Sequence, residues 1–98
     1  MSIKDSYDFQ NLVNETERLV LEHLEKELQK DYAKDFCKCQ ECVLDMAAYA
    51  LNSLKPVYRV SLLGKLYAHN LDDTEYGEEV SSAVRKAVLK IAENPSHD

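Results

Sequence analysis

The chain has 98 residues, the length of one small domain, and 45% of them are hydrophobic. It contains only two glycines and two prolines, while 31% of its residues are charged, which favours amphipathic helices over a β-fold rich in turns. The formal net charge of −6 argues against binding duplex nucleic acid through its phosphates. We therefore expect one all-α, mainly helical domain over residues 1–98.

The sequence indicates neither a membrane segment nor a secretory signal. Its apolar runs are shorter than the roughly 18 residues that span a bilayer, and Met1–Asp8 is polar. The three cysteines, an odd number within six positions, suit a reducing compartment better than a disulfide framework. These features predict a cytoplasmic protein.

Hydrophobic periodicity predicts the first two of three principal helices. Apolar side chains at helical spacing mark a helix from Asn11 to about Tyr32, and Asp31–Phe36 follows as a linker. A second helix is expected from about Gln40 to Leu54, where Pro56 prevents its continuation. Because this second helix is apolar around most of its circumference, we expect it to be the central one.

After the second helix, the pattern predicts short extended segments and then a third helix. Val57–Val60 and Leu62–Tyr67 are extended candidates that are too short for a separate sheet but able to pair across a dimer. The residues 72–74 are good N-cap types, and Asn94-Pro95 ends the helix that follows. Since two flanking helices cannot cover every side of the central one, we expect a two-fold symmetric homodimer.

The spacing Cys37-x-Cys39-x-x-Cys42 is the sharpest local signal. Cys39 and Cys42 lie three residues apart at a helix start, where the helix N-terminus favours the thiolate that zinc requires. A closed zinc site needs a fourth ligand, which would be His23, His69, a carboxylate, water or a group from another subunit. The pattern predicts zinc, and the alternative is three ordinary thiols.

A second group of residues could bind a nucleotide at the end of the second helix. Residues 37–68 hold four basic and two acidic side chains, so this stretch is locally basic within an acidic chain. Aromatic rings stack on nucleobases, amides and carboxylates bind base edges, and cations pair with phosphate. The candidates for these roles are Asp45, Tyr49, Asn52, Lys55, Tyr58 and Arg59. A turn that merely stops the helix is the structural alternative.

No catalytic motif is recognisable. The sequence contains no glycine-rich phosphate loop, no G-x-S-x-G and no H-E-x-x-H, and its three histidines are scattered. We therefore expect that the protein is not an enzyme.

The run from Cys37 to Tyr58, with its cysteines, alanine-rich helix and Lys55-Pro56, resembles the signature of the late competence development protein ComFB family. The resemblance extends over about residues 10–95. It implies a small α-helical homodimer, a cysteine-bound zinc in some members, a regulatory role without catalysis, and binding of cyclic di-GMP. The family pattern usually has two prolines where this chain has Lys55-Pro56.

Two functions from different classes follow. The first is a homodimeric receptor for cyclic di-GMP or a related cyclic dinucleotide. The alternative is a zinc-stabilised protein–protein interaction module in competence or motility regulation, with no nucleotide ligand. In either case a downstream regulatory protein is an expected partner.

Overall fold

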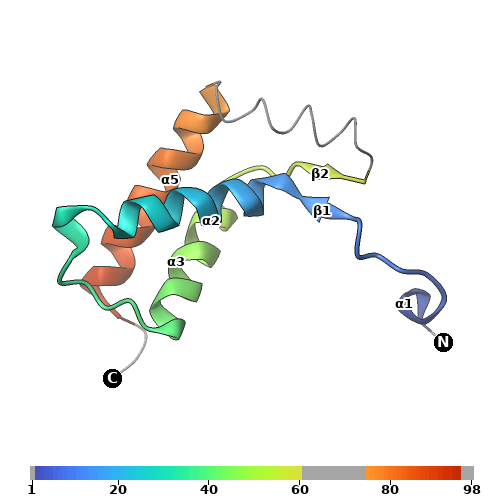
Figure 1. Cartoon of the computed structure of the whole chain (residues 1–98), viewed down its shortest axis with the longest axis horizontal. Coiled ribbons are helices and arrows are strands. Elements are labelled where there is room, and N and C mark those ends of the chain that lie inside the picture. Colours follow the sequence, from blue (N-terminus) through green and yellow to red (C-terminus); the bar gives the residue numbers. More distant parts are fainter. Residues whose placement is uncertain (1, 61–74, 96–98) are drawn as a thin grey trace.

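The structure is a computed structural model that describes residues 2–60 and 75–95. Three principal helices, α2 (Glu15–Leu28), α3 (Gln40–Asn52) and α5 (Glu75–Glu93), form the body of the molecule (Figure 1). The short helix α1 (Ile3–Ser6) lies apart from this body, in the N-terminal arm formed by residues 2–12. The prediction of a mainly helical fold with three principal helices is confirmed.

The first predicted helix begins later than expected, because Asn14 acts as its N-cap. Its side-chain oxygen accepts hydrogen bonds from the backbone N–H groups of Thr16 (3.1 Å) and Val57 (2.8 Å). The residues before the cap form strand β1 (Val13–Asn14) instead of helix, and β1 pairs antiparallel with β2 (Tyr58–Arg59). The expected extended segment after Pro56 is thus present, paired within the same chain.

The connection between α2 and α3 is more ordered than the predicted linker. Helix α2 ends at Leu28 rather than near Tyr32, and a 3-10 turn, η1 (Asp31–Ala33), follows. The Lys38 ammonium group donates to the carbonyl oxygens of Ala33 (2.7 Å) and Lys34 (3.2 Å). These bonds connect the end of η1 to the loop that precedes α3. The predicted extended segment Leu62–Tyr67 and the N-cap candidates at 72–74 lie outside the described residues.

One hydrophobic core joins the three helices, and α5 rather than α3 is its central member. Helix α5 packs extensively on both other helices, whereas α2 and α3 contact one another less. Valines and alanines on one face of α5 permit this double contact, while Leu44 and Tyr49 of α3 stay exposed. The core residues are Leu19, Val20, Leu24, Met46, Ala47, Ala50, Val80, Ala83, Val84, Ala87 and Val88.

The buried carboxylate of Glu27 connects the C-terminal end of α2 to the elements packed beside it. Glu27 accepts hydrogen bonds from the Tyr32 hydroxyl, the Lys30 ammonium group (2.9 Å) and the Arg85 guanidinium group (3.0 Å). It therefore links α2, η1 and α5.

Within residues 2–60 and 75–95, the structure contains no helix with the length and apolar character needed to cross a bilayer.

Candidate functional site

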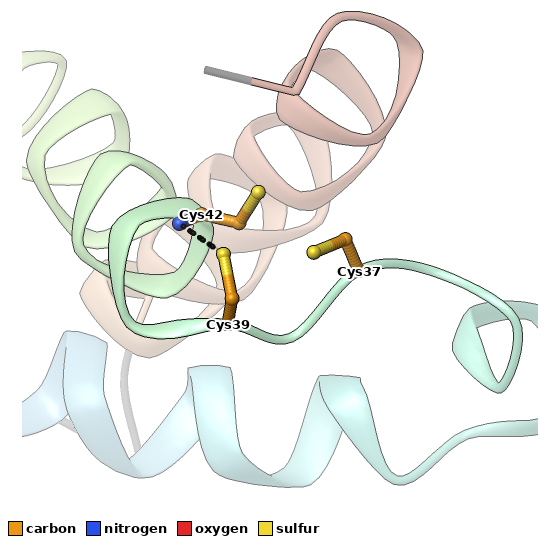
Figure 2. Close-up of side chains that lie close together, drawn as sticks. All are labelled: Cys37, Cys39 and Cys42. Atoms are coloured by element: carbon orange, nitrogen blue, oxygen red, sulfur yellow. Dashed lines mark hydrogen bonds between the residues drawn. The ribbon is translucent and has the colours of Figure 1, made fainter. Parts of the chain in front are cut away.

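The three cysteines come together at the N-terminus of α3 (Figure 2). Cys39 is the N-cap residue, Cys42 lies in the first turn, and Cys37 approaches from the preceding loop. The Cys39 sulfur accepts a hydrogen bond from the Cys42 backbone N–H at 3.5 Å. The three sulfur atoms all lie within 4.8 Å of one another, and none is in a disulfide.

This donor set is compatible with zinc. Thiolates on one tetrahedral zinc ion lie about 3.8 Å apart, so the sulfurs would have to contract by about 1 Å to share an ion. Burial, together with the neighbouring thiols of Cys39 and Cys37, raises the pKa of Cys42 to about 11. A bound cation would therefore have to displace the proton of this thiol. Of the predicted fourth ligands, His23 is not part of the cluster, and His69 lies outside the described residues.

The predicted nucleotide-binding residues of α3 lie along the helix beyond its cysteine end. Asp45 is half-buried, Tyr49 is 44% exposed, and Asn52 is exposed at the last position of the helix. Their spacing of four and then three residues places them on one side of the helix. Tyr49 and Asn52 are therefore accessible to a ligand, whereas Asp45 is only partly so.

The segment after α3 is held in place through the backbone of Lys55. Its carbonyl oxygen accepts hydrogen bonds from the hydroxyl groups of Thr16 (2.8 Å) and Tyr76 (2.7 Å), on α2 and α5. Lys55 is exposed, and the Tyr58 side chain in β2 is 62% exposed. The fold thus fixes the backbone here while leaving a cation and an aromatic ring at the surface.

Arg59 differs from these residues because it already has an anionic partner. Its Nε donates to the carboxylate of Glu15, which also accepts from Arg18 and is only 1% exposed. Burial alone would raise the pKa of Glu15, but the hydrogen bonds and charges of the two arginines lower it below its ordinary value. The bond uses only Nε, so among the described contacts the terminal amino groups of Arg59 are left for an anion.

Sequence reasoning missed Glu15 and the contribution of α5. Acidic residues are common in the first turn of a helix, so the position of Glu15 alone does not indicate a partner 44 residues away. A hollow of about 390 Å³ lies between Tyr49 and Ser53 of α3 and residues of α5 that include Glu79 and Lys86. In the sequence, the spacing of seven residues places Glu79 and Lys86 on the same face of α5. It does not indicate which helix that face contacts, so the hollow could not be predicted.

The fold and the cysteine cluster define a small helical domain with a candidate metal centre at a helix N-terminus. The chain belongs to the ComFB family, because the family model for the late competence development protein ComFB matches residues 13–95. This result confirms the resemblance stated from the sequence. A comparison with curated proteins finds no match.

The solved structures include a similar protein. The late competence protein ComFB from Bacillus subtilis matches with a TM-score of 0.68 and 25% sequence identity. The match covers 87% of this chain and 92% of that chain. The similarity therefore extends over nearly the whole of both chains and supports the three-helix architecture.

Proposed function

We propose that this chain is a non-catalytic, homodimeric receptor for cyclic di-GMP. The observation that carries the proposal is that Tyr49, Lys55 and Tyr58 are all exposed at or just after the end of α3, with the partly exposed Arg59 following in β2. Exposed rings beside cations suit a ligand that has two guanine bases and two phosphates. Membership of the ComFB family supports the same ligand through the resemblance described above.

The residues divide into three roles. Tyr49 and Tyr58 stack on guanine, Lys55 and the terminal amino groups of Arg59 pair with phosphate, and Asn52 with Asp45 binds base edges. Glu15 holds the Arg59 side chain in a fixed orientation, which lowers the entropy lost on binding. A two-fold symmetric dimer would present two such surfaces to a ligand that is itself two-fold symmetric.

Isothermal titration calorimetry with cyclic di-GMP tests the proposal. Stacking of one base is worth about 1–3 kcal/mol, so Tyr58→Ala should weaken binding by about tenfold. Tyr7→Ala is the matched control, because Tyr7 is similarly exposed (66%) but lies in the N-terminal arm, at the end of α1. No heat from folded protein at ligand concentrations in the tens of micromolar would exclude the receptor function.

We further propose that Cys37, Cys39 and Cys42 hold a zinc ion that stabilises the start of α3. Such an ion would tie the loop before α3 to its first turn, a structural role without chemistry of its own. Elemental analysis of protein purified without added metal should find about one zinc per chain. A variant with all three cysteines replaced by serine is the control, and the same metal content in that variant would contradict the assignment.

The alternative is a zinc-stabilised module that binds another regulatory protein, and the exposed apolar side chains of the N-terminal arm favour it. Exposed apolar side chains continue along this arm as far as the residue before β1, at Ile3, Tyr7, Phe9 and Leu12. Surfaces of this kind mark protein contacts. A pull-down of the regulatory partner with and without cyclic di-GMP separates the two functions, because the module would capture its partner equally in both.

A further inference from the structure

The hollow between α3 and α5 combines five polar or aromatic groups from two helices. Helix α3 provides Tyr49 and Ser53, four residues apart, and α5 provides Glu79, Ser82 and Lys86 from one face. Its volume of about 390 Å³ falls within the range of roughly 300–1,000 Å³ typical of small-molecule sites. Because α3 and α5 pack directly on one another, the walls of the hollow belong to the three-helix body.

The groups that line the hollow are available to a ligand. Glu79 and Lys86 are exposed, and neither forms an ion pair within the part of the chain that the structure describes. The Ser53 hydroxyl donates to the Ala50 carbonyl oxygen at 2.9 Å, so its oxygen remains able to accept a hydrogen bond. The hollow thus contains a carboxylate, an ammonium group, hydroxyl groups and an aromatic ring.

We propose that this hollow binds one guanine base of the ligand and that Glu79 selects guanine over adenine. The inference rests on the proposed receptor function. Guanine carries two adjacent donors, N1–H and the N2 amino group, and a carboxylate accepts both at once. Adenine has an unprotonated N1 at the corresponding position, so it leaves the carboxylate without this pair of donors.

The other groups complete recognition of the base. Tyr49 packs against the face of the guanine, as already proposed for this residue. Lys86 donates to the guanine O6 or to the adjoining phosphate, both of which are acceptors. The hollow shares Tyr49 with the residues assigned to the ligand, and Ser53 in its wall lies two residues before Lys55 in the chain. Helix α5 therefore adds a base-specific contact to those proposed for Asp45 and Asn52 of α3.

Calorimetric titrations with cyclic di-GMP and cyclic di-AMP test this inference on the full chain. Glu79→Gln should weaken cyclic di-GMP binding by about tenfold or more and reduce the preference over cyclic di-AMP. Lys86→Ala should weaken cyclic di-GMP binding by a similar factor. The controls are Glu78→Gln and Lys90→Ala, which make the same charge changes at exposed positions of α5 that do not line the hollow.

The outcomes separate the two proposals. If the wild-type chain binds cyclic di-GMP and the Glu79 and Lys86 variants bind within twofold of their controls, the hollow is not the guanine site, although the receptor function stands. An equal loss of affinity for both dinucleotides in Glu79→Gln would overturn the role of Glu79 in base selection. Absence of binding by the wild-type chain would overturn both. Circular dichroism should show unchanged folding, since the substituted side chains are exposed.

Discussion

The two ends of α3 are built in different ways. At its N-terminus, three cysteines within six positions converge through the geometry of one loop and one helical turn. At its C-terminus, the predicted ligand surface depends on distant contacts, since Thr16 and Tyr76 hold the Lys55 carbonyl and Glu15 holds Arg59. The first candidate site is therefore local in the chain, whereas the second exists only once α2, β2 and α5 have assembled.

This difference predicts that core substitutions disturb the two ends unequally. A change that loosens α2 or α5 should affect the surface at Lys55 and Arg59 before it affects the cysteine cluster. A change at the cysteines should act mainly on the loop before α3. The following substitutions test that division, from the largest expected effect to the smallest.

Glu15→Ala should have the largest effect. It removes a buried carboxylate that two arginines share, so Arg59 loses this partner and Arg18 is left with Glu22. Breaking a buried ion pair costs about 3–5 kcal/mol, and because both arginines reach solvent we expect a loss of about 3 kcal/mol in the free energy of unfolding. Urea denaturation measures this loss, and the melting temperature should fall by more than about 10 °C.

The matched control for this substitution is Glu25→Ala, on the exposed face of α2. Surface substitutions of this kind usually change stability by less than about 0.5 kcal/mol. Equal losses in the two variants would show that the Glu15 carboxylate does not join β2 to α2.

Cys42→Ser should have the next largest effect, at the other end of α3. Zinc-loaded wild-type protein should melt several degrees above protein treated with a chelator, because a metal that binds only the folded state stabilises it. The Cys42→Ser variant should melt at the lower temperature and respond little to the chelator. Differential scanning calorimetry decides this, and a wild-type protein indifferent to the chelator would identify the cysteines as ordinary thiols.

Acid should weaken the protein through its buried carboxylates. Burial raises the pKa values of Glu15 and Glu27, but their hydrogen bonds and ion pairs outweigh it and lower both below the ordinary value of 4.5. A lowered pKa in the folded state gives stability that is present above the unfolded pKa and lost as the pH falls through the folded one. Urea midpoints should therefore hold steady down to about pH 5 and decline below about pH 4.5.

The acid response can be assigned to a residue. Glu15→Gln should show a smaller decline below about pH 4.5 than the wild-type chain, because it lacks one of the groups that bind protons on unfolding. Glu25→Gln should decline as the wild type does. A Glu15→Gln profile parallel to that of the wild type would place the acid sensitivity elsewhere.

Thr16→Val should have the smallest effect. It removes one of two hydroxyl groups that bind the Lys55 carbonyl oxygen, and Tyr76 still satisfies that oxygen. We expect a loss of about 1 kcal/mol by urea denaturation. Thr16→Ser keeps the hydroxyl group and should retain more of this stability than Thr16→Val. A serine variant no better than the valine variant would show that the hydrogen bond is unimportant.

The sequence predicted the helical class and the cysteine cluster well, because both depend on short-range patterns. The bounds of α3 differ from the expectation by two residues at one end, and α5 ends as expected before Asn94. Strand β1 was missed because Val13 continues the apolar spacing of α2, and the start of the helix is set by the Asn14 cap and by the pairing of β1 with β2.

The ligand surface was predictable only in part. Tyr49, Lys55 and Tyr58 were selected for their residue types, and the structure leaves all three exposed. Arg59 was selected in the same way, yet its side chain is only 18% exposed because Glu15 binds it. Nothing in a single sequence shows which side of α5 faces α3, so the hollow that contains Glu79 could not be expected.

A titration of isotope-labelled protein with cyclic di-GMP, followed by the backbone amide signals in NMR spectra, tests the assignment of the two ends of α3 most directly. The largest shifts are expected for residues 49–59 and for the part of α5 around Glu79 and Lys86, while the amides of Cys37, Cys39 and Cys42 stay nearly unchanged. Spectra that do not change with ligand, or that change most at the cysteines, would contradict a receptor surface at the C-terminal end of α3.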